Sequence, residues 1–130
     1  MKKIILTVLI VLLVAAGGLA FFLLSGNKEK DRSFNYDPGE YFVTDIADSE
    51  RLLKADIIIR MSDKRKEKFY SENNHRIRSV VIRAIRGRSE NELKGSGAQG
   101  NVSDDIIRML NTEFESDEFL QIFYNEFVIQ

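Results

Sequence analysis

The sequence contains no cysteine and a single histidine, His75. Without cysteine the chain forms no disulfide and has no thiolate to act as a nucleophile or metal ligand. One histidine excludes the zinc and catalytic sites that need two imidazoles. Tryptophan is absent as well, and Pro38 is the single proline. Thiol chemistry and histidine-based metal sites are therefore excluded from the functions to consider.

A strong net charge is also missing, because 19 Lys and Arg are matched by 20 Asp and Glu. The apolar residues, in contrast, are gathered at one end, where residues 4–24 carry no charged side chain. A helix of this length spans about 31 Å, the thickness of the hydrocarbon core of a bilayer. A core helix of a soluble domain would need a polar face. We therefore expect residues 1–24 to form a transmembrane anchor that contacts membrane lipid.

Basic residues flank this apolar run on both sides. Lys2 and Lys3 precede it, whereas Lys28, Lys30 and Arg32 follow it, so their count leaves the orientation nearly undecided. The very short leading segment favours an N-terminus in the cytoplasm and export of the remaining chain. The expected location is the cytoplasmic (inner) membrane, crossed once, with a periplasmic or extracytoplasmic C-terminal domain.

A cleaved signal peptide is the alternative to a retained anchor. Residues 4–14 could serve as its apolar region, and Gly18 and Ala20 are small enough for a peptidase site. The apolar run continues through residues 21–24, however, and is longer than the ~7–15 residues of such a region. We therefore favour the retained anchor.

Two further segments follow the anchor. Residues 25–38 are polar and are typical of a juxtamembrane linker, in which Phe34 and Tyr36 are the large apolar groups. These two side chains either lie at the membrane interface, contact the folded domain or dock against a partner's membrane span. We expect residues 39–130 to form the extracytoplasmic domain, because this stretch is long enough to bury its own core.

The strands of this domain are predicted from residues that alternate between apolar and polar. A strand begins at Gly39, a turn over 47–51 follows, and a second strand over 53–61 shows strict alternation. Two such runs joined by a short polar link predict an antiparallel hairpin. The last strand, 119–129, is apolar on both faces; we expect both to be covered and the strand to pair with the hairpin. Its side chains at 122, 124 and 128 are assigned to one face, and those at 123, 127 and 129 to the other.

The helices lie between the hairpin and the last strand. A helix over 64–86 has an apolar face that includes Phe69 and Tyr70, and Ser89 opens a short capped turn. A glycine-rich loop over 95–100 precedes a second helix, with two aspartates in its first turn. The order is therefore β-β-α-α-β, and the predicted fold class is α+β, with helices packed on a small antiparallel or mixed sheet.

Three motifs could indicate chemistry, and each has a simpler explanation. Residues 95–100 spell GxGxxG, but a dinucleotide fingerprint needs a buried strand directly before its glycines, and polar residues stand there. His75 lies on the polar helix face without a partner for acid–base work. The acidic pairs at 104–105 and 117–118 are adjacent in sequence, which gives no reason for two carboxylates to converge on a substrate. We expect no catalytic, cofactor-binding or metal site.

Charge is segregated along the chain. Residues 64–88 contain nine basic and two acidic side chains, whereas residues 90–118 contain eight acidic and two basic ones. These charges either cancel within the fold, or the basic face of one subunit meets the acidic half of its neighbour in a head-to-tail ring. A basic helix also suits nucleic acid, but an anchored, mildly acidic domain argues against that ligand.

The last strand resembles a known family. Residues 124–130, Tyr-Asn-Glu-Phe-Val-Ile-Gln, are similar to the closing strand of the flagellar basal-body-associated protein FliL family, with Asn125 where threonine is usual. Five other features agree in order along the whole chain: the lysine-led anchor, the start of the first strand at 39–43, the strand at 53–57, and the segments at 76–81 and 89–93.

This resemblance implies a single-pass membrane protein of the bacterial flagellum. Members associate with the stator units that drive the rotor and support torque and swimming or swarming motility. Their periplasmic domains resemble the stomatin-like SPFH fold and assemble as rings, and no catalysis, nucleic acid or small-molecule substrate is implied. A generic membrane-anchored scaffold without a motor role is the alternative, and an extracytoplasmic enzyme that uses paired carboxylates is the third.

Overall fold

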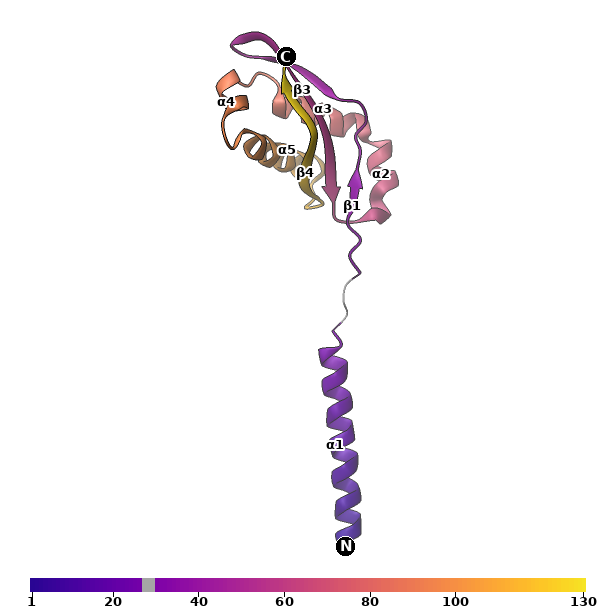
Figure 1. Cartoon of the computed structure of the whole chain (residues 1–130). Helices are drawn as coiled ribbons and strands as arrows, with labels where there is room; N and C mark the ends of the chain where they lie inside the picture. Colours follow the sequence, from indigo (N-terminus) through magenta and orange to yellow (C-terminus); the bar gives the residue numbers. More distant parts are fainter. Residues whose placement is uncertain (27–29) are drawn as a thin grey trace. The chain divides into compact units, whose positions relative to one another are not determined.

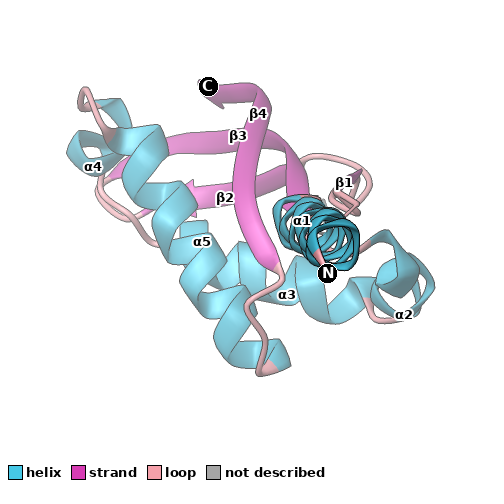
Figure 2. Cartoon of the chain, turned by 90° about the horizontal axis from the view of Figure 1, so that it is seen from below, coloured by secondary structure: helices cyan, strands magenta, loops and turns pink. Residues whose placement is uncertain are grey.

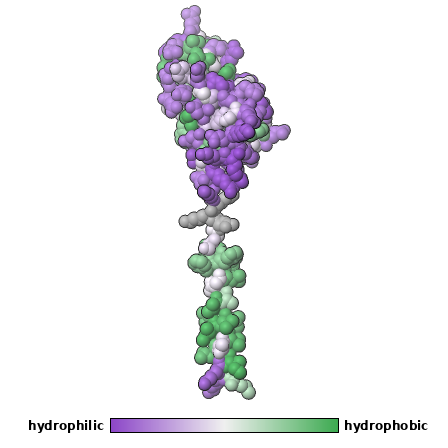
Figure 3. All heavy atoms as spheres, turned by 90° about the vertical axis from the view of Figure 1, so that its right-hand side faces the viewer, coloured by the Kyte–Doolittle hydropathy of each residue, from purple (hydrophilic) through white to green (hydrophobic). Residues whose placement is uncertain are grey.

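The computed structural model describes residues 1–26 and 30–130, and the chain divides into two compact units, residues 1–30 and 31–130 (Figure 1). The first unit consists of helix α1, Lys2–Leu24, which is exposed along its whole length. Figure 3 shows α1 as an almost continuous apolar surface beyond its first residues. Its 23 residues are long and apolar enough to cross a membrane, as the sequence predicts.

The second unit is an α+β fold. A 3₁₀ turn, η1, follows the third strand. The elements, in order, are β1 Phe34–Tyr36, β2 Phe42–Ile46, β3 Ser49–Met61, η1 Lys64–Lys66, α2 Glu67–Glu72, α3 Asn74–Ile85, α4 Glu90–Lys94, α5 Ala98–Phe114 and β4 Phe119–Ile129. The four strands form one antiparallel sheet. The helices α3 and α5 lie together against one face of this sheet (Figure 2).

Strand β3 is the centre of the sheet. One side of it pairs with β2 and then β1, and the other side pairs with β4 along most of its length. Its side chains at 53, 55, 57, 59 and 61 are all buried, while those between them are partly exposed. The period of two predicted from the sequence is therefore confirmed, because successive side chains of a strand point to opposite faces.

The hairpin is confirmed with a tighter turn than expected. Strand β3 begins at Ser49, so only Ala47 and Asp48 lie outside the two strands. Ile46 pairs with Ser49 after a shift in register at Asp45. The polar side chains at 49–51, which suggest a turn, instead extend the exposed start of β3.

The strand β1, which the sequence does not predict, lies within residues 25–38, the expected linker. Phe34 and Tyr36 pair with the end of β3 as β1 and are buried, so they contact the folded domain, one of the three alternatives. The Tyr36 hydroxyl donates a hydrogen bond to Asn74 Oδ1 at 2.8 Å, and the amide of Asn74 donates to the carbonyl of Pro38 at 3.0 Å. The short strand is missed in the sequence because three residues show no resolvable period.

The predicted helix over 64–86 is broken at Asn73. This residue leaves the helical conformation, with φ −104° and ψ 18°, and ends α2 before α3 begins. The break turns α2 away from the face that α3 buries. Tyr70 remains buried, but Phe69, which the helical pattern assigns to the core, is 48% exposed. A single continuous helix over this range is therefore wrong.

Helix α5 begins earlier than predicted. The glycine-rich segment is helical from Ala98 onward, so Asp104 and Asp105 lie beyond the first turn. Ala98, Val102, Ile106 and Leu110 are all buried. These residues are spaced four apart and form one continuous apolar stripe, which stabilises the helix despite the roughly 1 kcal/mol cost of a glycine within it.

The last strand is covered on one face only. Register shifts lie between Asp56 and Ile57 and between Arg60 and Met61 of β3, and they leave Asn125 and Leu120 of β4 without a direct partner. An extra residue at 125 reverses the alternation, so Phe127 and Ile129 lie on the core side with Tyr124, and Val128 faces out. The expectation that Phe127 lies opposite Tyr124 is wrong for this reason. The expectation that much of both faces is covered is wrong because the helices pack on one face of the sheet.

Replacement of neighbouring isoleucines in β3 tests whether one face of the sheet is buried and the other is exposed. Ile59→Ala should lower the free energy of unfolding by about 2–5 kcal/mol, because it leaves a cavity at a side chain that is fully buried. Ile58→Ala, on the other face of the same strand, should cost clearly less. The comparison is made by denaturant unfolding of the full chain in a mild detergent. Equal losses for the two variants would show that both faces of β3 are buried.

Candidate interaction surface

The basic residues of α3 are paired with acidic residues of α5. Arg76 and Arg83 lie 3.2 and 3.4 Å from the carboxylate of Glu113. Arg88, just after α3, donates a hydrogen bond to Asp105, which also accepts one from Arg108 at 3.0 Å. The segregated charges therefore cancel in part within one chain, because the two helices that carry them pack side by side.

Other basic side chains of this region are also engaged within the fold. Arg86 lies 3.1 Å from the carboxylate of Asp45, and Lys66 forms an ion pair with Glu118. Arg78 donates hydrogen bonds to the carbonyls of Pro38 and Glu40 at 3.1 and 2.7 Å. Its guanidinium also stacks on the ring of Phe42, with the central carbon 4.3 Å from the ring centroid. These contacts hold the β1–β2 connection against α3.

The motifs considered for chemistry lie apart from one another. Residues 95–97 connect α4 to α5, so a helix, not a buried strand, precedes the GxGxxG segment. His75 is exposed on α3. Glu118 accepts hydrogen bonds from Lys66 and the Tyr70 hydroxyl, while Asp117 is exposed beside it. The structure does not bring these groups together into one site.

The outer face of the sheet carries large apolar side chains. Leu120, Phe123 and Val128 of β4 are 50%, 41% and 42% exposed. On the opposite side of the same face, Val43 of β2 is 51% exposed, and Leu52 of β3 is 41% exposed. Lys54, Asp56, Arg60 and Glu126 lie on the same face among these apolar groups. Antiparallel sheets commonly present a polar face to solvent, so the exposed apolar groups make this face the best candidate for a protein contact. We call it the outer sheet face.

Strand β4 also forms a free edge of the sheet. Among the described residues it pairs with β3 alone. Leu52 and Gln130 exchange two backbone hydrogen bonds, of 2.7 and 2.9 Å. Because residues of an antiparallel pair alternate between bonded and non-bonded positions, the backbone groups of Ile122, Tyr124 and Phe127 point away from β3. We call this side of β4 the β4 edge.

Helix α5 supports the β4 edge from the core side. The Tyr124 hydroxyl donates to the carbonyl of Gln99 at 3.2 Å and accepts from Ser103 at 3.0 Å. Burial raises the pKa of Tyr124 above its ordinary value, and the nearby carboxylate of Asp104 raises it further. At the other end, the side chain of Asn111 bonds both backbone groups of Phe119, at 3.0 and 3.1 Å. These contacts fix the position of the strand.

Comparison with known protein families gives one match. Residues 36–130 match the family described as Flagellar basal body-associated protein FliL. The chain belongs to the FliL family. A search of curated proteins finds no matching sequence. The family is a flagellar accessory family, and together with the apolar helix α1 it supports a membrane-anchored protein of the flagellar basal body.

The sequence indicates the apolar side chains of the outer sheet face but not their exposure. The sequence predicts that Phe123 and Val128 lie on a strand with much of both faces covered. The exposure of the outer sheet face is therefore not predicted. The period of a strand shows which side chains share a face but not whether anything packs on that face. The bulge at Asn125 also exchanges the faces of Phe127 and Val128. Val43, in contrast, occupies a position where the alternation of its strand places a solvent-facing residue. The sequence alone therefore indicates that this apolar side chain is exposed.

Replacement of adjacent aspartates tests the α3–α5 ion pairs. Hydrogen bonds from Arg88 and then Arg108 hold the pKa of Asp105 below its ordinary value. A group whose pKa is lowered by folding stabilises the fold above its unfolded pKa of about 3.9, and this contribution is lost as the pH falls through the folded value. Asp105→Asn should therefore lower the melting temperature at pH 7 and flatten its decline in acid.

Asp104→Asn is the matched control, because Asp104 is exposed and has no ion pair among the described residues. Melting temperatures of the full chain between pH 2 and 7 (a range of about five units around the carboxylate pKa) make the comparison. If the melting temperatures of the two variants declined equally as the pH falls, the ion pairs of Asp105 would not stabilise the fold.

Proposed function

We propose that this protein is a non-enzymatic component of the flagellar motor that associates with the stator and supports torque generation and swimming or swarming motility. Membership of the FliL family supports its place at the basal body. The outer sheet face carries the proposal at the level of structure, because exposed large apolar groups on a folded domain mark a contact surface.

The anchor and the domain have separate tasks in this proposal. Helix α1 holds the chain in the cytoplasmic membrane with its N-terminus in the cytoplasm, and the folded domain lies in the extracytoplasmic or periplasmic space beside the stator. The predicted segments are an anchor over residues 1–24, a linker over 25–38 and a domain over 39–130; β1 attaches the end of the linker to the sheet. Copies of the domain assemble as a ring.

The internal ion pairs bear on how such a ring is held. Arg76, Arg83 and Arg88 are engaged with α5 of their own chain. A head-to-tail contact between the basic and acidic helices of neighbouring copies would have to break these pairs. Contacts that leave these ion pairs intact need no such exchange and are therefore the favoured basis for assembly.

Deletion of this protein tests the motor role. Cells without it should swim or swarm more slowly, most clearly in viscous medium where the load on the motor is high, and should grow normally. The wild-type chain supplied from a plasmid should restore motility. Stator proteins should be captured with the tagged full chain from detergent-solubilised cells and identified by mass. Normal motility under load, together with a capture that lacks stator proteins, would favour the generic scaffold.

The orientation of the anchor is tested with single cysteines, because the natural chain contains none. In intact cells Ser96→Cys, between α4 and α5, should react with a membrane-impermeant maleimide. Lys3→Cys should react only after the membrane is permeabilised. The reverse pattern would place the domain in the cytoplasm, and release of a shortened chain into the medium would indicate a cleaved signal peptide.

A further inference from the structure

The two edges of the sheet differ in how they are protected from further pairing. Natural proteins shield edges with short strands, proline and charges. The edge formed by β1 and β2 consists of strands of three and five residues, separated by Pro38 and Gly39. Asp45 of β2 also forms an ion pair with Arg86, which directly follows α3. This edge has the usual protection.

The β4 edge has less of this protection, and its main device is the pair of bulges at Leu120 and Asn125. The strand has 11 residues and contains no proline, lysine or arginine. Glu126 is its single charged residue, and it is paired with Lys54 at 3.0 Å. The outer-face side chains of Leu120, Phe123 and Val128 are 41–50% exposed along this edge. A long edge strand with exposed apolar side chains and without proline, lysine or arginine is a site for addition of a strand.

The unpaired stretch lies in the middle of the strand. Asn111 occupies both backbone groups of Phe119 at one end, and Arg51 donates to the carbonyl of Ile129 at 3.0 Å at the other. Between these points, the outward backbone groups at 122, 124 and 127 have no hydrogen-bond partner among the described residues. The stretch is long enough for a strand of ordinary length to pair with it.

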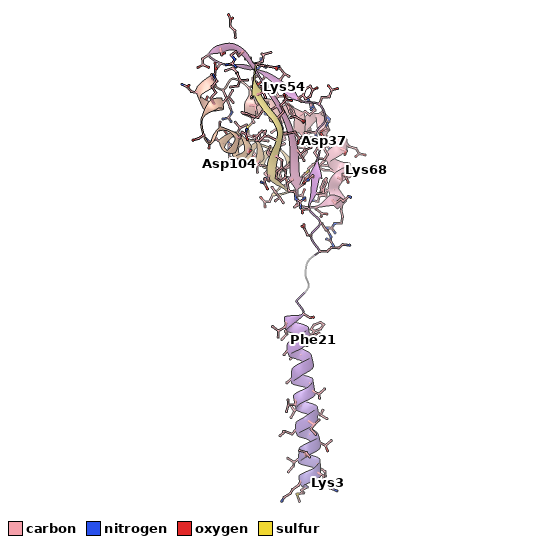
Figure 4. The ribbon with its side chains drawn as sticks, in the orientation of Figure 1. Lys3, Phe21, Asp37, Lys54, Lys68 and Asp104 are labelled. Atoms are coloured by element: carbon pink, nitrogen blue, oxygen red, sulfur yellow. The ribbon has the colours of Figure 1, made fainter. Side chains whose placement is uncertain are left out.

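The charged groups near the β4 edge that have no ion-pair partner among the described residues are acidic. Arg51, beside the Ile129 carbonyl, and Arg88, near Tyr124, are each held by a carboxylate. Residues 109–130 contain five acidic residues and no lysine or arginine. Three of the five are engaged in ion pairs, but Glu115 and Asp117 are exposed and have no such partner among the described residues. Asp104 of α5 adds a third unpaired carboxylate near Tyr124. Figure 4 shows Asp104 and the basic Lys68 on opposite sides of the domain.

We propose that the β4 edge binds an extended, basic segment of another protein as a fifth strand of the sheet. Backbone hydrogen bonds to residues 122–127 would supply affinity. Alternate apolar side chains of the segment would pack beside Leu120, Phe123 and Val128, and its lysines or arginines would lie near Asp104 and Asp117. A second copy of this chain suits the edge less well, because its own β4 has the same unpaired carboxylates nearby and like charges repel.

This inference adds to the proposed function the chemistry of a partner. It rests on the proposed function only in one respect: the domain is taken to act through contacts with other proteins. Its test uses no cells and no motor. The two can therefore fail separately.

The experiment measures binding of defined peptides to the full chain in a neutral detergent. The probe is a fluorescent peptide of about nine residues, the length of a typical strand, in which valine alternates with lysine. One control peptide has glutamate in place of lysine, and another has proline in place of the central valines. We expect the lysine peptide to bind at least about tenfold more tightly than either control, and more weakly as salt is added.

Hydrogen exchange locates the binding site. The lysine peptide should slow exchange of the backbone amides of Ile122, Tyr124 and Phe127, which have no hydrogen-bond partner among the residues that the structure describes. The amides of β2 should be unchanged. Phe123→Lys should weaken binding by about tenfold or more, because it removes an apolar contact and adds a repelling charge. Val43→Lys is the matched control and should bind as the natural chain does, since Val43 is an exposed apolar residue of the same face at the other edge.

Several results would overturn the proposal. They are equal binding of the lysine and glutamate peptides, protection of β2 instead of β4, and a loss of binding in Val43→Lys as large as in Phe123→Lys. Protection of the β4 amides that grows with protein concentration in the absence of peptide would show that a second copy occupies the edge. Circular dichroism of both lysine variants checks that each keeps its fold.

Discussion

The burial of one face of β3 is the constraint on which the rest of the domain depends. Every second side chain from Leu53 to Met61 is excluded from solvent. All three other strands pair with β3. The helices α3 and α5 lie on the buried face because their apolar stripes have no other surface to cover. A residue inserted in β3 would move its whole apolar set to the wrong face.

Ion pairs connect the polar sides of the helices α3 and α5. A basic α3 and an acidic α5 pack side by side, and Glu113 and Asp105 each accept hydrogen bonds from two guanidinium groups. The pairs are partly exposed, so each contributes little to stability. Their main effect is on recognition, because they neutralise the charges that a nucleic acid or a neighbouring copy could otherwise use.

The exposed large apolar side chains of the domain lie mainly on the outer sheet face. The helices cover the inner face only, and the bulge at Asn125 turns Val128 outward while it brings Phe127 toward the core. Among the residues of 31–130, the outer sheet face and the β4 edge therefore remain uncovered. A small domain that acts by contact needs such a surface more than it needs a cavity.

The sequence by itself determined the apolar helix α1, the alternation in β3, the capped turn at Ser89 and the α+β class, because each depends on the spacing of residues close together in the chain. The family was also recognisable from the last strand. Only the tertiary structure decided the break at Asn73, the early start of α5, the pairing of β1 and the exposure of β4. These features depend on contacts between distant segments, such as Tyr36 with Asn74 and β4 with β3, and no local period in the sequence records them.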